Sequence, residues 1–104
     1  MNRDNLHPME QIVAPYLEVE GVAAAALVSR DGLLVASAGG ADLGLEALAA
    51  YSASIMSSAM GLSQELGTDP PSSLALEFPV RKLTLALLTD ELLLMLVGSS
   101  KRSG

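Results

Sequence analysis

The alternation of apolar and polar residues predicts two helices and five strands in this chain of 104 residues. Apolar residues recur at helical spacing from Leu6 to Val19, and a longer helix is predicted from Leu43 to Leu66. Short apolar or alternating runs bounded by Gly, Pro and Asp indicate the strands. They are expected at Val22 to Ser29, Leu33 to Ala38, Leu74 to Phe78, Leu83 to Thr89 and Leu92 to Val97.

Turn-forming residues limit the first elements. Pro15 predicts a kink or an early end of the first helix, for which Asn5 or His7 would be the N-cap. Gly21 then breaks the helical pattern. Asp31-Gly32 favours the positive backbone angles of a two-residue turn, so the first two strands are expected to form a hairpin.

The long helix has its own start and stop signals. Asp42 is a fair N-cap, and Gly67 stands where a left-handed C-cap is expected, with Pro70-Pro71 just beyond it. Short connections imply antiparallel pairing of successive strands. The unbroken run LLLMLV at 92–97 is typical of a strand buried on both faces, in the middle of a sheet. We therefore expect an α/β (α+β) sandwich in which two helices cover a five-stranded antiparallel sheet, in the order α-β-β-α-β-β-β.

The long helix carries no charged side chain from residue 47 to 64. At 100° per residue, its larger apolar residues define an arc that we expect to face the sheet: Leu45, Leu48, Ala49, Ile55, Met56, Ala59, Leu62 and Leu66. The opposite arc is made of small residues between two charged ends: Glu46, Ala47, Ala50, Ser54, Ser57, Ser58, Gly61 and Glu65.

Small residues at this spacing allow a second helix backbone to approach closely. Gly61 costs roughly 1 kcal/mol relative to Ala in a helix interior, and no local feature of the sequence offsets that cost. We hypothesise that the small arc packs on a second copy of the chain. The alternative is that alanine and serine form an ordinary solvent-exposed surface.

Composition excludes several classes of function. The net charge is −6 and the six basic residues are scattered, which argues against a nucleic-acid partner. Cysteine is absent, so neither a disulfide framework nor a thiolate metal site is expected. No apolar run approaches the roughly 20 residues that span a bilayer, and the start MNRDNLHP lacks the apolar region of a secretory signal. We expect a cytoplasmic protein without membrane insertion.

The sequence also offers no catalytic constellation. Neither GxxxxGK[ST] nor GxGxxG is present, and the single histidine, His7, lies near the N-terminus without a serine or acid positioned to use it. Asp31 and Asp42 are explained as turn and cap residues, and Arg30 as a hairpin residue. No catalytic, cofactor-binding or metal-binding residue is predicted, and an enzyme is not expected.

The segment VEGVAAAALVSRDGLLVAS resembles the opening hairpin of the Roadblock/dynein light chain family. The positions that carry the resemblance are Gly21-Val22, Asp31-Gly32 and the Val35-Ala36-Ser37 ending. The Ala/Ser/Met helix ending in Gly67 and the order of the last three strands extend it over residues 6–98. The prokaryotic, MglB-like branch is the most similar in type.

The resemblance implies a profilin-like roadblock domain over residues 1–98, and the polar sequence at 99–104 itself predicts a flexible tail. It also implies a homodimer in which third strands pair edge to edge and central helices lie side by side, without a cofactor. The small arc and the third strand together give the residues expected at the dimer or partner interface: Ala47, Ala50, Ser54, Ser57, Ser58, Gly61, Leu74 and Leu76. The structural turn residues predicted from the sequence pattern are Gly21, Asp31, Gly32 and Gly67.

Members of the family commonly regulate or scaffold small Ras-like GTPases. We therefore predict a homodimeric, non-catalytic module that binds such a GTPase and alters its nucleotide cycle by ordering the GTPase's own switch loops. A purely structural adaptor in a larger motor or signalling complex is the alternative. A small-molecule sensor is a third possibility, but the Ala/Leu core gives little sign of a polar-lined pocket.

Overall fold

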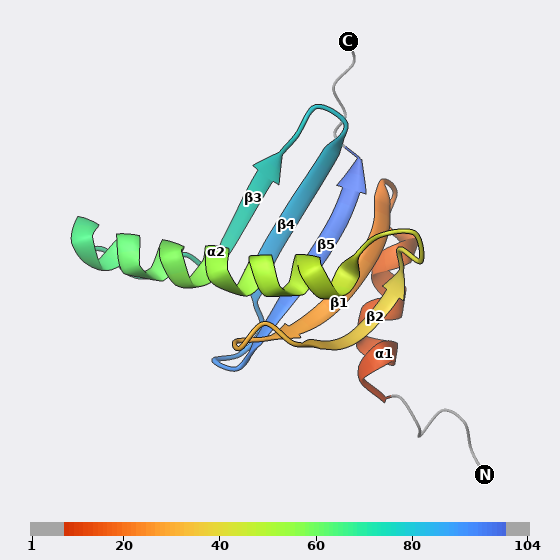
Figure 1. Ribbon diagram of the computed structural model, residues 1–104, viewed down its shortest axis with the longest axis horizontal. Coiled ribbons are helices and arrows are strands. Elements are labelled where there is room, and N and C mark those ends of the chain that lie inside the picture. The colour runs from red at the N-terminus through yellow and green to blue at the C-terminus, as the bar shows by residue number, and fades with distance from the viewer. Residues whose placement is uncertain (1–7, 100–104) are drawn as a thin grey trace.

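The computed structural model describes residues 8–99 and contains a single sheet (Figure 1). Its elements are α1 (Pro8–Val13), the 3₁₀ helix η2 (Ala14–Glu18), β1 (Val22–Ser29), β2 (Leu34–Gly39), α2 (Leu45–Leu66), β3 (Ser73–Glu77), β4 (Arg81–Leu87) and β5 (Leu92–Ser99). Every pairing is antiparallel and the strand order is β2-β1-β5-β4-β3. The predicted fold is confirmed. The predicted tail, 99–104, lies outside the described residues except for Ser99.

The last strand, β5, lies in the centre of the sheet, as its apolar run predicted. Leu93 and Met95 are fully buried in the core cluster beneath α2. Leu94, between them, belongs to a second cluster that includes Val13 of α1. Because successive side chains of a strand point to opposite faces, β5 contributes to both halves of the core.

Pro15 ends the first α-helix early. The α-helix stops at Val13, and the chain continues as the 3₁₀ helix η2 with proline in its first turn. Proline has no N–H for an i→i−4 bond and its ring would meet the carbonyl of Gln11, so the regular helix cannot continue through it. The cap candidates Asn5 and His7 lie outside the described residues.

The β1–β2 hairpin is present, but the prediction of a two-residue turn was wrong. The Gly32 N–H donates to the Ser29 carbonyl, and the Ser29 N–H donates to the Leu33 carbonyl, both at 2.9 Å. The loop therefore holds three residues, and only Gly32, at φ 93°, has a positive φ. A type I turn followed by a left-handed glycine is the usual form of such a loop.

The sequence signals predicted the C-terminal end of α2 correctly but not its N-terminal end. Gly67 adopts the left-handed conformation at φ 72°. Its N–H donates to Gln64 and that of Thr68 to Ser63, which is the Schellman pattern. Asp42 was predicted as the N-cap, but the helix begins at Leu45 and its N-cap is Gly44, without a side-chain hydrogen bond. Asp42 instead belongs to the preceding turn.

Replacing Gly32 with alanine should lower the free energy of unfolding by about 1–3 kcal/mol, because it places a non-glycine residue at positive φ. The new Cβ would also lie 3.2 Å from the Cα of Ala50 on α2. Urea denaturation measures the change. Gly61→Ala is the matched control, since no atom lies within 4 Å of its Cβ position, and it should stabilise the fold by about 1 kcal/mol. Equal midpoints for the two variants would contradict this account of the loop.

Candidate partner-binding surface

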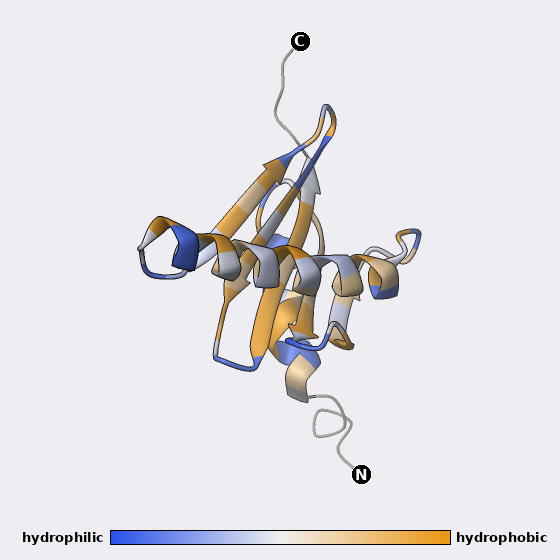
Figure 2. Cartoon of the chain, turned by 60° about the vertical axis from the view of Figure 1, so that its left-hand side comes forward, coloured by the Kyte–Doolittle hydropathy of each residue, from blue (hydrophilic) through white to orange (hydrophobic). Residues whose placement is uncertain are grey.

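The long helix α2 presents three distinct faces. The buried face follows a regular helical stripe whose fully or nearly buried residues are Leu45, Ala49, Ser52, Ala53, Met56 and Ser63. A second, apolar stripe runs along one flank of the helix. The third face carries only small residues between the charged residues Glu46 and Glu65. In Figure 2 the strongest blue on the long helix lies near its two ends.

The sheet-facing arc predicted from the sequence is rotated relative to the real one. Leu45, Ala49 and Met56 are buried as expected. Leu62 and Leu66 were expected against the sheet, but they are 59% and 70% exposed. Leu48, Ile55 and Ala59 are only half-buried.

Two serines lie on the buried face instead of larger apolar residues. Ser52 is fully buried, and its Oγ donates a hydrogen bond to the Met95 sulfur at 3.2 Å. Ser63 donates to the carbonyl of Met60 at 2.6 Å. The short side chain of Ser52, with the Met95 sulfur as acceptor, allows α2 to lie close to the central strand, and neither serine is left with an unsatisfied donor.

The apolar flank of α2 borders a groove over the sheet. The flank consists of Leu48, Tyr51, Ile55, Ala59, Leu62 and Leu66. The groove has a volume of about 400 Å³ and is lined almost entirely by apolar surface. The lining residues come from α2, β3, β4, β5 and the connections next to α2 and β3: Leu43, Leu48, Tyr51, Ile55, Leu76, Phe78, Arg81, Lys82, Leu83 and Val97. In Figure 1 the end of β3, the start of β4 and the end of β5 extend beyond the helix on this side.

Several residues of this surface were missed as interface residues. Tyr51 is 70% exposed and Phe78 52%, and both line the groove. The signal was available in the spacing, because positions 48, 51, 55, 59, 62 and 66 form an i, i+3, i+7 stripe. The prediction merged this stripe with the buried one into a single broad arc.

The C-terminal turns of α2 extend past the edge of the sheet (Figures 1 and 2). The helix has 22 residues, about 33 Å at 1.5 Å per residue. Five strands at about 4.8 Å spacing span only about 19 Å between the outer strands. The α2 backbone approaches β1, β2 and β5 most closely, so the excess length lies beyond β3. We call residues 59–66 the overhang.

The two edges of the sheet differ. At the β2 edge, the register shifts between Leu27 and Val28, which leaves Val35 as a bulge. A bulge disrupts an edge as a pairing template. At the β3 edge, the pairing with β4 is regular from Ser73 to Glu77. Leu74 and Leu76 are half-buried on the α2 face of this strand, so β3 offers a regular edge beside the groove.

The small-residue face of α2 is exposed throughout. Its members are Ala47, Ala50, Ser54, Ser57, Ser58 and Gly61, all predicted as interface residues. The small size of Ala50 has a local cause, because the Gly32 loop lies against its backbone. Gly61 has no such cause, since nothing lies within 4 Å of its Cβ position.

Arg30 joins the two hairpin loops to α2. Its guanidinium donates to the Asp90 carbonyl at 2.8 Å and to the Met60 sulfur at 3.2 Å. Its N–H donates to the Glu91 carbonyl at 3.1 Å. The side chain is therefore held by the fold, which agrees with its interpretation as a hairpin residue.

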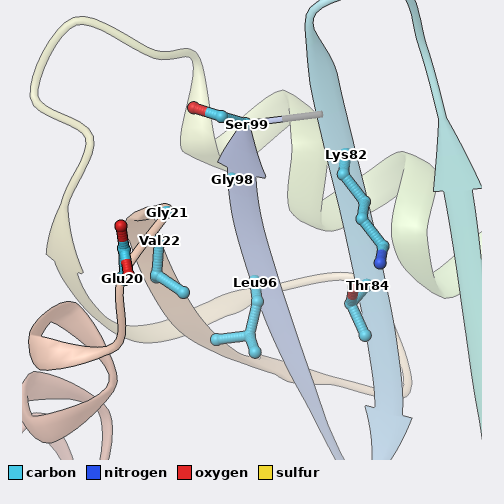
Figure 3. A pocket seen from close by; sticks show the side chains of 8 residues that line it. All are labelled: Glu20, Gly21, Val22, Lys82, Thr84, Leu96, Gly98 and Ser99. Atoms are coloured by element: carbon cyan, nitrogen blue, oxygen red, sulfur yellow. The ribbon is translucent and has the colours of Figure 1, made fainter. Parts of the chain in front are cut away.

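A second hollow of about 330 Å³ lies on the opposite face of the sheet, which α1 and η2 cover only in part (Figure 3). Val22 and Leu96 form part of its floor, while Glu20 and Lys82 stand on opposite sides. Charged groups that do not converge give little support for a small-molecule site.

Within residues 8–99, no three His, Cys, Asp or Glu side chains are grouped so that they could hold a metal ion. None of the helices in this range is both long and apolar enough to cross a bilayer. The features that stand out in the described part of the chain are an apolar groove, an overhanging helix and a regular strand edge.

This architecture defines a small α/β interaction domain. The chain matches the Roadblock/LC7 domain over residues 8–98 and belongs to that family. The resemblance noted in the sequence is confirmed. Among proteins with curated functions, none matches the sequence of this chain.

Solved structures share the fold. Myxococcus xanthus MglB has a TM-score of 0.85 at 17% identity, over 99% of this chain and 78% of that one. The gliding protein MglB of Thermus thermophilus gives 0.77 at 20% identity, over 86% and 69%. A Roadblock/LC7 domain from Streptomyces avermitilis gives 0.79 at 17% identity, over 88% and 78%. At these identities the likeness establishes the fold.

The rotation of α2 can be tested with two glutamates placed two residues apart. Ser52→Glu should destabilise the domain by about 3 kcal/mol or more, because it buries a charge without a partner. Ser54→Glu, on the exposed face, should change the free energy of unfolding by less than about 0.5 kcal/mol. Thermal denaturation followed by circular dichroism measures both. Equal stability of the two variants would show that the helix is rotated differently.

Proposed function

We propose that this protein is a homodimeric, non-catalytic regulator that binds a small Ras-like GTPase. The observation that supports it most is the overhang of α2 beside an apolar groove. In a two-fold dimer joined through the β3 edges, the overhang of each copy would lie over the sheet of the other. The two α2 helices would then lie side by side, and each groove would be filled by the partner's apolar flank.

The exposed apolar residues make this association favourable. Leu62, Leu66, Tyr51 and Phe78 are each more than half exposed in a single chain. Fully burying one such side chain contributes about 1.5–3 kcal/mol. Several of them together are comparable to the total stability of a small domain, about 5–15 kcal/mol. Pairing of the β3 edges would also satisfy backbone groups that a free edge leaves to solvent.

The small-residue face, hypothesised from the sequence to pack on a second copy of the chain, is instead the surface that we assign to the GTPase. In the proposed dimer, the apolar flanks face each other and the small faces of both helices remain outward. Ser54, Ser57 and Gly61 then lie on a surface with low side-chain bulk, on which another backbone can pack closely. The GTPase itself is implied by the family resemblance. The protein would act on the GTPase's switch loops, since α2 contains no arginine to insert and Arg30 is held elsewhere.

A purely structural adaptor remains the second candidate. The same surface supports it, because an apolar groove and a free strand edge can also bind subunits of a larger assembly. Such binding would not depend on the nucleotide state of any GTPase. The experiment that separates the two is binding and GTP hydrolysis by a Ras-like GTPase of the same organism, measured with and without this protein. Binding that depends on the nucleotide supports a regulator, whereas equal binding in the GDP and GTP states supports an adaptor.

Leu62→Glu should convert the dimer to a monomer at micromolar concentration, because it places a charge in the buried contact. Light scattering coupled to size-exclusion chromatography measures the mass. Leu33→Glu is the matched control: Leu33 is 66% exposed, similar to Leu62, but lies in the β1–β2 loop, and its variant should remain a dimer. A wild-type chain that is monomeric at high concentration would rule out the proposed assembly.

Ser54→Glu should leave the dimer intact and weaken GTPase binding about tenfold or more, because it introduces bulk and charge on the small-residue face. Isothermal titration calorimetry measures the affinity, with light scattering on the same sample. If Ser54→Glu instead yields monomers, the second copy occupies the small-residue face. If dimerisation and GTPase affinity are both unchanged, this face has neither role.

A further inference from the structure

The sulfur of Met60 is in contact with a cation. Met60 lies in the overhang of α2, is half-buried and packs against the core beneath the helix. The Arg30 guanidinium donates to this sulfur at 3.2 Å, and its other terminal nitrogen donates to the Asp90 carbonyl at 2.8 Å. The contact therefore links the overhang to the β1–β2 and β4–β5 loops. A thioether is only a weak acceptor, so the charged donor has a poor partner on this side.

Oxidation of the thioether turns this weak acceptor into a strong one. Hydrogen peroxide, or another hydroperoxide, transfers one oxygen atom to a lone pair of the sulfur, so that an S–O bond forms and the O–O bond breaks. The sulfur loses two electrons, the peroxide gains them, and water or an alcohol leaves. The sulfoxide oxygen carries partial negative charge, and rotation about the Cγ–Sδ bond brings it to the guanidinium. A hydrogen bond from an ionised donor is roughly twice as strong as a neutral one.

The other methionines within residues 8–99 do not combine access to solvent with a nearby cation. Met56 and Met95 are fully buried, so a peroxide reaches their sulfurs only when the domain opens. Met9 is exposed on α1, but no hydrogen-bond donor contacts its sulfur. Met60 is therefore the methionine at which the fold already supplies a partner for an oxidised side chain.

We propose that Met60 is an oxidation site whose sulfoxide is bound by Arg30. The oxidised side chain ties the overhang of α2 to the two hairpin loops more firmly than the thioether does. A methionine sulfoxide reductase reverses the step, because the sulfoxide oxygen leaves as water while two thiols are oxidised to a disulfide. This inference needs neither the proposed dimer nor the GTPase, since every group in the contact belongs to one chain.

A thermodynamic cycle of oxidation and Arg30 replacement tests the contact. In a Met9→Leu background, hydrogen peroxide should oxidise Met60 in the folded chain while Met56 and Met95 stay reduced, which peptide mass spectrometry measures. The oxidised and reduced forms are then unfolded in urea, both with Arg30 and with Arg30→Leu. The ratio of the folding equilibrium constants of the oxidised and reduced forms should be roughly fivefold larger with Arg30 than with Arg30→Leu.

Met60→Leu in the same background is the control, since it keeps the apolar bulk but has no sulfur to oxidise. Peroxide should leave its urea midpoint unchanged. Oxidation of Met1 is common to both arms of the cycle and cancels. A ratio that is equal or smaller with Arg30 would overturn the contact with the sulfoxide. A Met60 that stays reduced while the domain is folded would overturn the oxidation site itself.

Discussion

The structure depends on a mismatch between the length of one helix and the width of one sheet. A 22-residue helix that crosses five strands cannot be supported along its whole length by its own sheet. The strands in turn extend beyond the helix on one side, where Leu76, Leu83 and Val97 line an apolar groove. The same chain therefore has a helix that projects beyond its sheet and a part of the sheet that the helix does not cover. A two-fold rotation about the β3 edge would place the projecting helix of one copy over the uncovered part of the sheet of the other.

The distribution of aromatic side chains agrees with this interpretation. The chain has one phenylalanine, two tyrosines and no tryptophan. Phe78 and Tyr51 lie on the groove and are mostly exposed, while the core beneath α2 contains alanine, leucine, valine and methionine. Aromatic residues provide large contact areas at low cost in side-chain entropy, which suits an interface. Tyr16, by contrast, is half-buried against the second core cluster. A thin core with two of its three aromatic residues outside is a domain that association would stabilise.

The sequence was sufficient for the order of the elements and for the central position of β5. It was also sufficient for the Gly67 cap, since each of these follows from a strong local signal. The rotation of α2 could not be predicted in the same way. Alanine and serine fit both buried and exposed helix surfaces, so Ser52 and Ser54 look equivalent until the packing on Met95 distinguishes them. The apolar flank was then interpreted as core, because periodicity marks a stripe as apolar without saying what covers it.

The geometry of two connections, the β1–β2 loop and the segment before α2, could not be predicted from the sequence for a related reason. Asp31-Gly32 signals a hairpin, but the number of loop residues depends on where the strands begin to pair and on the contact between Gly32 and α2. Asp42 is a good capping residue, but Leu43 and Gly44 still follow it before helical geometry begins at Leu45, so it lies too early in the chain to cap the helix.

One consequence concerns the use of a single helix for two partners. In the proposed assembly, the apolar flank of α2 contacts the second copy and the small-residue face contacts the GTPase. A GTPase that touches both small faces binds only when the helices are side by side, so its affinity includes the free energy of dimerisation. Linkage then requires that the GTPase strengthen the dimer by the same factor as dimerisation strengthens GTPase binding. A helix that projects beyond its own fold is suited to this coupling, because neither partner's site is complete in one chain.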